Sequence, residues 1–123
     1  MVLNKFETIQ LLKPDTTGGK PLMAAIKNRK TDRQFQQKNL SLKHLSDILW
    51  VANGINRTDG KRTVPSAMAL YPLQTYVLLA NGVYLYNPKK HLLEPIVEGD
   101  YRELAGRQDF VKTAPLNLVF IAD

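Results

Sequence analysis

Apolar side chains recur at a helical spacing in one clear stretch of the chain, residues 41–53. Ser41 is a favourable N-cap before it, and Gly54 is a typical stop signal after it. Trp50 and Val51 widen the apolar stripe, so we expect this helix to be buried on more than one side, against a second subunit as well as the core. The residues three or four positions apart that define the stripe are Leu42, Leu45, Ile48, Leu49 and Ala52.

A shorter helix is predicted over residues 21–27. Pro21 suits a first helical position, and the apolar residues that follow it share one side. Residues 1–20 show little periodicity, and Pro14 precedes a turn-forming run. We therefore expect residues 1–20 to form an extended N-terminal arm and residues 21–123 to form the folded domain.

Further along the chain the pattern changes to that of strands. Residues 74–79 are rich in β-branched and aromatic side chains, and Asn81-Gly82 is a strong signal for the turn of a hairpin with residues 83–86. Residues 92–97 predict a third, interrupted strand. Helices and hairpin strands in this order indicate an α+β fold with a mostly antiparallel central sheet flanked by helices.

The last elements are short. Single helical turns are predicted over residues 67–70, with Ser66 as cap, over residues 101–105 after Asp100, and near Phe110. The apolar run 116–121 is typical of a strand in the middle of a sheet, which needs neighbours on both edges. Because the sequence ends two residues later, we expect the domain to be truncated at its C-terminus.

Composition narrows the class of protein. The chain has 123 residues, 44% of them hydrophobic and 23% charged, which suits one soluble domain with its own core. Absence of cysteine excludes disulfides and thiolate chemistry, and the isolated His44 and His91 do not predict a metal site. The chain contains no run of about 18 apolar residues that would predict a membrane span, and its first residues lack the apolar core of a signal peptide. We expect a cytoplasmic protein, although a signal removed before residue 1 would leave no trace.

Charge is distributed unevenly along the chain. Residues 1–62 contain 12 Lys and Arg against 5 Asp and Glu, a net charge of +7, whereas the remaining residues carry a net charge of −1. This asymmetry predicts an anionic partner for the first half, either a phosphorylated small molecule or a nucleic acid. Nucleic acid is disfavoured because only Phe6 and Phe35 are available for base stacking among the first 40 residues.

A candidate phosphate site lies directly after the first predicted helix. Arg29, Lys30 and Arg33 surround the hydroxyl residue Thr31. Guanidinium groups bind phosphate oxygens in a bidentate way, Lys adds a point charge, and a hydroxyl donates a further hydrogen bond. A basic run that leaves a helix is also commonly a solvated face, so the cluster alone permits both interpretations.

Four segments in this order and spacing resemble the FMN-dependent nitroreductase superfamily over residues 21–123. They are the basic motif at residues 29–35, the helix LSLKHLSDILWVANGI, the segment KRTVPSAMALYPLQTYVLLANGVYLY and the segment QDFVKTAPLNLVFIAD. The R-T-V-P-S-A-M-A-L-Y-P run is most similar to the branch that includes azoline-oxidising components of peptide-modifying systems. The resemblance covers only the N-terminal two thirds of such a domain.

The resemblance implies a flavin fold, a homodimer with two FMN sites at the subunit interface, and hydride transfer from NAD(P)H through FMN to a quinone, a nitroaromatic or another oxidised acceptor. It implies no catalytic side chain, because the chemistry belongs to the cofactor. Ala69 departs from the family, in which a polar amide is common at this position. An inactive flavin-fold binding protein or fragment is the alternative. The cofactor contacts that the resemblance assigns are Arg29, Lys30, Thr31, Arg33, Pro65, Ser66 and Gln108, with Pro65 and Ser66 acting on the partner subunit's flavin.

Overall fold

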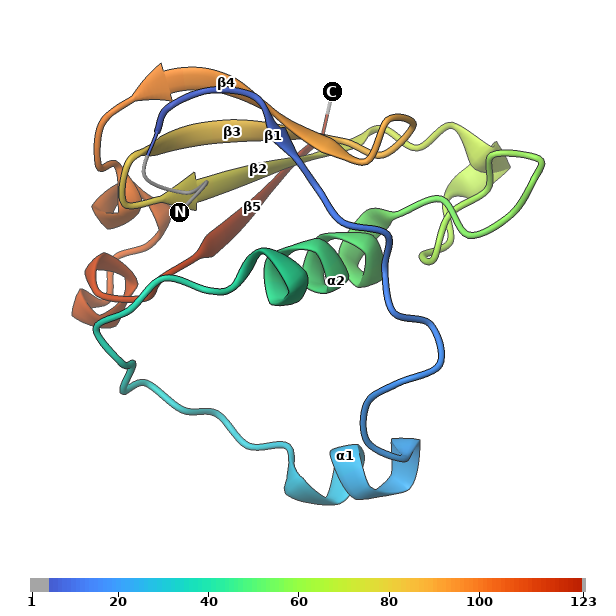
Figure 1. The fold of residues 1–123 in the computed structure, drawn as a ribbon, viewed down its shortest axis with the longest axis horizontal. Helices are drawn as coiled ribbons and strands as arrows, with labels where there is room; N and C mark the ends of the chain where they lie inside the picture. The colour runs from blue at the N-terminus through green and yellow to red at the C-terminus, as the bar shows by residue number, and fades with distance from the viewer. Residues whose placement is uncertain (1–4, 123) are drawn as a thin grey trace.

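A five-stranded antiparallel sheet organises the structure, with the strands in the order β1-β4-β3-β2-β5 (Figure 1). The computed structural model describes residues 5–122. Its strands are β1 (Ile9–Gln10), β2 (Leu73–Leu79), β3 (Gly82–Asn87), β4 (Leu92–Glu98) and β5 (Asn117–Ala122).

Within residues 5–122, two α-helices and three short 3-10 helices accompany the sheet. They are α1 (Leu22–Asn28), α2 (Leu42–Asn53), η2 (Ala67–Ala69), η3 (Arg102–Ala105) and η4 (Asp109–Lys112). Helix α2 lies across one face of the sheet, whereas α1 lies apart from it (Figure 1). These elements confirm the predicted α+β class and antiparallel sheet. Within residues 5–122, no helix is long and apolar enough to cross a membrane.

Helix α2 begins and ends as its sequence predicts. The hydroxyl of Ser41 accepts a hydrogen bond from the backbone N–H of His44 at 3.1 Å, and the N–H of Gly54 donates to the carbonyl of Trp50 at 2.7 Å. Leu45 and Leu49 are completely buried. They belong to the core cluster, which contains Ile9, Leu45, Leu49, Val77, Leu79, Tyr84, Tyr86 and Leu93.

Within residues 5–122 the last strand has one of the two neighbours that its predicted central position requires. β5 pairs with β2 from Asn117 to Ala122, and the described residues place no strand on its other side. Phe120 and Ile121 are 50% and 47% exposed. An apolar run reveals that a strand has two apolar faces, but it does not show whether neighbours within the same chain cover them.

The hairpin turn lies one residue earlier than Asn81-Gly82. Leu79 pairs with Gly82, so Ala80 and Asn81 form the turn and Gly82 begins β3. A Cβ atom on Gly82 would lie 2.5 Å from a ring carbon of Phe6. Glycine is therefore needed here because the ring of Phe6 packs closely against the strand.

The first residues add an edge strand that the sequence pattern does not reveal. Ile9 pairs with Leu93 of β4 and is almost fully buried. Farther along, the backbone N–H of Leu12 donates to the hydroxyl of Ser46 on α2 at 2.8 Å, while its carbonyl lies 2.7 Å from Nε2 of His91. The segment that contains Ile9 and Leu12 thus joins the sheet to the buried Ser46 of α2.

A second contact, one residue farther along α2, also attaches the N-terminal segment to this helix. The backbone N–H of Asp15 donates to Oδ1 of Asp47 at 3.0 Å, and Nζ of Lys43 donates to Oδ2 of Asp47 at 3.0 Å. The hydrogen bond from the N–H of Asp15 is the main cause that lowers the pKa of Asp47 below its ordinary value of 3.8, and the hydrogen bond from Lys43 is the second cause. Asp47 thereby attaches the residues that lead to α1.

We predict that Asp47→Asn lowers stability near neutral pH and that this difference disappears in acid. A carboxylate whose pKa is lower in the folded state stabilises that state above its unfolded pKa, and this contribution is lost as the pH falls through the folded pKa. Urea unfolding of both proteins at about pH 7 and about pH 2.5 measures the two differences. A difference that is the same at both pH values would contradict this role of the charge.

Candidate functional site

The basic segment predicted to bind phosphate is exposed. Arg29 follows α1 as its C-cap, and its backbone N–H donates to the carbonyl of Ile26 at 3.3 Å. Lys30, Thr31 and Arg33 continue along a connection to α2 that has no regular secondary structure up to residue 40. Among residues 5–122, none of the three cations forms an ion pair. Their charge is therefore available to an external anion.

The structure brings the end of this segment close to η4, which begins directly after Gln108. The guanidinium carbon of Arg33 lies 5.9 Å from the ring centroid of Phe110, and the ring of Phe35 lies 6.4 Å from the same ring. Gln108 is exposed, and its carbonyl accepts a hydrogen bond from the N–H of Val111 at 3.4 Å. Arg33 and Gln108 thus belong to one surface, which sequence separation alone does not predict.

An ion pair positions η4. Nε and Nη2 of Arg102 donate to the two carboxylate oxygens of Asp100 at 2.9 and 2.8 Å, and Nη1 donates to the carbonyl of Ala114 at 3.1 Å. Arg102 is the main cause of a lowered pKa for Asp100. Because Arg102 precedes η4 and Ala114 follows it, the guanidinium closes the loop that presents Gln108. The sequence prediction included Asp100 only as a helix cap.

Pro65 and Ser66 lie in the loop that follows α2. The hydroxyl of Ser66 accepts a hydrogen bond from the N–H of Tyr71 at 2.8 Å and does not cap η2. Met68 and Ala69 have φ angles of 54° and 53°. A helical turn thus forms close to the predicted residues 67–70, but the predicted cap by Ser66 is wrong, and Met68 and Ala69 adopt the left-handed region.

Sequence reasoning missed a second group of cations beside Ser66. Arg57, Lys61 and Arg62 line a cavity of about 490 Å³ together with Pro65 and Ser66. The guanidinium carbon of Arg62 lies 4.7 Å from the ring centroid of Tyr71, which lines the same cavity. The sequence feature that indicates these cations is the net charge of +7 over residues 1–62, which includes this loop up to Arg62.

The seven predicted contact residues do not form one site within a single chain. The basic segment precedes the N-terminal end of α2, and the loop with Pro65 and Ser66 follows its C-terminal end (Figure 1). A helix of 12 residues separates its two ends by roughly 18 Å. Arg33 and Gln108 are near each other, whereas Pro65 and Ser66 lie at the opposite end.

Comparison with known proteins gives consistent similarities. Residues 26–123 match the Nitroreductase family. A Methanocaldococcus jannaschii protein named as a putative nitroreductase is 35% identical over 127 residues, which cover 95% of this chain and 64% of that protein. The trifolitoxin operon protein TfxC of Rhizobium leguminosarum bv. trifolii is 28% identical over 102 residues, covering 66% of this chain and 29% of that protein.

Solved structures support the same fold. The crystal structure of a putative nitroreductase from Ralstonia eutropha superimposes with a TM-score of 0.87 at 46% identity, covering 94% of this chain and 56% of that chain. The E. coli microcin synthetase McbBCD complex contains a chain with a TM-score of 0.57 at 23% identity, covering 96% and 53%, which supports the fold alone. The chain thus spans less than two thirds of the length of these relatives.

We predict that Arg102→Met destabilises the protein by about 1–2 kcal/mol, because it removes a charge-assisted pair whose acidic partner is half exposed. Urea unfolding measures the loss, and the amide NMR signals of residues 108–112 should shift. Arg107→Met is the control, since Arg107 has no ion-pair partner among the described residues. Equal stability of the two variants would show that the Arg102 pair does not hold η4.

Proposed function

Because the chain belongs to the nitroreductase family, we propose that it is the FMN-binding part of an NAD(P)H-dependent oxidoreductase. Hydride would pass from NAD(P)H through FMN to a quinone, a nitroaromatic or another oxidised acceptor. The observation that carries the proposal is the group of exposed cations Arg29, Lys30 and Arg33 around Thr31, none of which is neutralised within the described residues.

This donor set suits the phosphate of FMN. Arg29 and Arg33 would bind phosphate oxygens through their guanidinium N–H groups, Lys30 would add charge, and Thr31 would donate its hydroxyl hydrogen. Gln108, on the surface that Arg33 shares, would donate or accept a hydrogen bond at the ribityl chain or the ring. Bound FMN supplies the hydride chemistry, and the residues of this chain bind and orient it.

Pro65 and Ser66 would contact the flavin bound to the other subunit of a homodimer. Their position at the far end of α2 supports this arrangement, because one chain does not bring them to the basic segment. The apolar side of α1 supports it too. Met23 is 76% exposed and Ile26 is 59% exposed, and Val51 on α2 is 63% exposed. Such surface is stabilised when a second copy covers it.

We predict that Arg29→Ala and Arg33→Ala each weaken FMN binding about ten- to hundredfold, since each removes charge-assisted hydrogen bonds worth about 1.5–3 kcal/mol. Lys30→Ala should have a smaller effect. Quenching of flavin fluorescence during titration with protein measures the dissociation constants, and Lys90→Ala controls for loss of one exposed charge.

Unchanged affinity in both Arg variants would show that the cluster is only a solvated face. The reaction is tested separately by adding NADH or NADPH anaerobically to the reconstituted protein and following the loss of flavin absorbance. Flavin that stays bound and oxidised would select the alternative, a binding protein without turnover.

We predict that Ile26→Glu and Val51→Glu each convert a dimer into monomers, because a buried carboxylate without a partner is strongly unfavourable. These positions test the interface better than Trp50 does, because the indole N–H of Trp50 donates to the carbonyl of Ile55 at 3.2 Å within its own chain. Replacement of Trp50 would therefore also disturb the fold. Light scattering after gel filtration measures the mass, with Lys90→Glu as control. A monomeric parent protein, or dimers of both variants, would contradict the proposed interface.

A further inference from the structure

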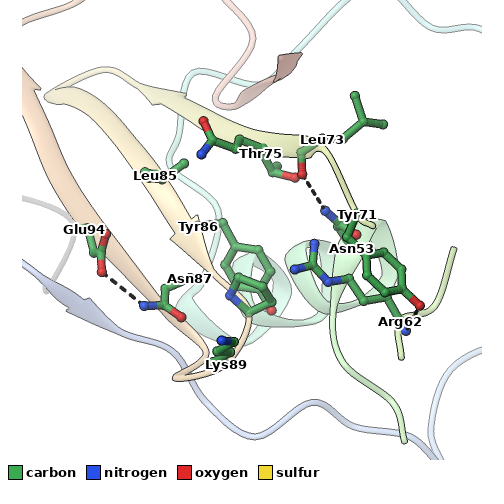
Figure 2. A pocket seen from close by; sticks show the side chains of 12 residues that line it. Asn53, Arg62, Tyr71, Leu73, Thr75, Leu85, Tyr86, Asn87, Lys89 and Glu94 are labelled. Atoms are coloured by element: carbon green, nitrogen blue, oxygen red, sulfur yellow. Dashed lines mark hydrogen bonds between the residues drawn. The ribbon is translucent and has the colours of Figure 1, made fainter. Parts of the chain in front are cut away.

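A cavity of about 280 Å³ lies between the C-terminal end of α2, the loop with Arg62 and Tyr71, and strands β2, β3 and β4. None of the seven residues proposed for FMN lines it. Its volume is close to the lower limit for small-molecule sites, about 300 Å³. Figure 2 shows side chains from all these elements around one space, with the guanidinium of Arg62 on the Tyr86 side of the Tyr71 ring.

The charged groups in the wall favour an anion. Arg62 and Lys89 line the cavity, and neither has an ion-pair partner within the described residues. The carboxylate in the wall belongs to Glu94, which accepts a hydrogen bond from the side-chain amide of Asn87 at 3.1 Å. Two cations against one carboxylate leave a net positive charge in a partly enclosed space, where charge interactions are stronger than in water.

A buried donor without a partner gives an independent indication. Thr75 lines the cavity with only 2% of its surface exposed, and its hydroxyl makes no hydrogen bond within the described residues. Buried hydroxyl groups are normally hydrogen-bonded, and an unpaired one is costly. An oxygen-rich ligand inside the cavity would satisfy it.

The aromatic wall provides an uncharged surface beside these groups. The hydroxyl of Tyr86 lies 2.8 Å from Nδ1 of His91, so it already has a partner. Burial raises the pKa of Tyr86 from 10.0 to about 12, so its phenol stays neutral well above physiological pH. Tyr71 extends the aromatic surface next to it, whereas the side chain of Leu85 lies on the opposite face of β3.

We propose that this cavity binds a small organic molecule through one carboxylate or phosphate group, with Arg62 and Lys89 binding its oxygen atoms. Thr75 donates its hydroxyl hydrogen to the same group or to a neighbouring oxygen. The apolar part of the molecule lies against the two tyrosine rings. This inference does not depend on flavin binding.

Three probes of similar shape test the proposal by NMR titration of the isotope-labelled protein: sodium benzoate, phenyl phosphate and the neutral benzamide. We expect at least one of the anions to bind at least about tenfold more tightly than benzamide. The comparison of benzoate with phenyl phosphate identifies the preferred oxyanion. Absence of binding by both anions at millimolar concentration, or equal binding of benzamide, would overturn the proposal.

Substitutions locate the site. Arg62→Gln should weaken binding of the preferred anion at least about tenfold, and Lys89→Gln should weaken it by a smaller factor. Lys90→Gln and Arg107→Gln are matched controls, because neither residue lines the cavity. Wild-type affinity in both Arg62→Gln and Lys89→Gln would overturn the assignment.

Thr75→Val separates ligand binding from folding. Valine has a shape similar to that of threonine but lacks the unpaired buried hydroxyl, so the free energy of unfolding should be unchanged or increased. The affinity for the anion should decrease. If Arg62→Gln does not fold, the signals of the parent protein decide. Shifts at Leu85, Tyr86 and Lys89 support the site, whereas shifts confined to residues 29–33 would place the anion in the basic segment and overturn it.

Discussion

The burial of Leu45 and Leu49 of α2 against the sheet is the interaction on which the other features depend. Both side chains are fully enclosed by residues of three strands and of the first segment of the chain. Truncation of a leucine in such a core costs about 2–5 kcal/mol, which is a large part of the stability of a domain of this size. Because α2 is held in this way, its two ends are fixed. The loop with Arg62 follows one end, whereas residues 34–41 connect the basic segment to the other.

The segment from residue 16 to residue 40, which leads from Asp15 to the start of α2, is much less buried than the core. None of residues 16–40 is buried, and α1 has only 7 residues with its apolar side chains exposed. An isolated helix of this length is marginal in water. Its attachments are Asp15 on one side and the contacts of Arg33 and Phe35 with Phe110 on the other. A second copy that covered these apolar side chains, as in the proposed homodimer, would stabilise α1.

The elements with strong local signals were predictable from the sequence. Helix α2 has an apolar stripe and a serine cap, and the β2–β3 hairpin has a turn signal that was wrong by only one residue. Strand β1 has two residues and offers no alternation to detect, so its pairing with β4 depends on distant partners. The left-handed backbone at Met68 and Ala69 has no local signal either, because neither residue prefers that region.

The candidate sites show the same limit. The motif around Thr31 is contiguous in sequence, so it was recognisable before its surroundings were known. In contrast, the cavity beside Arg62 combines a loop residue with Thr75 on β2 and Lys89 after β3, and no spacing rule connects these positions. Only the sheet register brings them together.

The distribution of charge partners connects these observations. The ion pairs among the described residues involve Asp15, Asp47, Asp59, Asp100 and Asp109, and most of them join residues within four positions of each other. Acidic side chains therefore serve mainly to shape turns and to attach the first segment to α2. Within residues 5–122, by contrast, Arg29, Lys30 and Arg33 after α1 and Arg62 after α2 have no acidic partner. Uncompensated cations repel one another and add no folding stability. Binding of an anion to each group would give these residues a physical role, and the proposed FMN phosphate would account for only the first group.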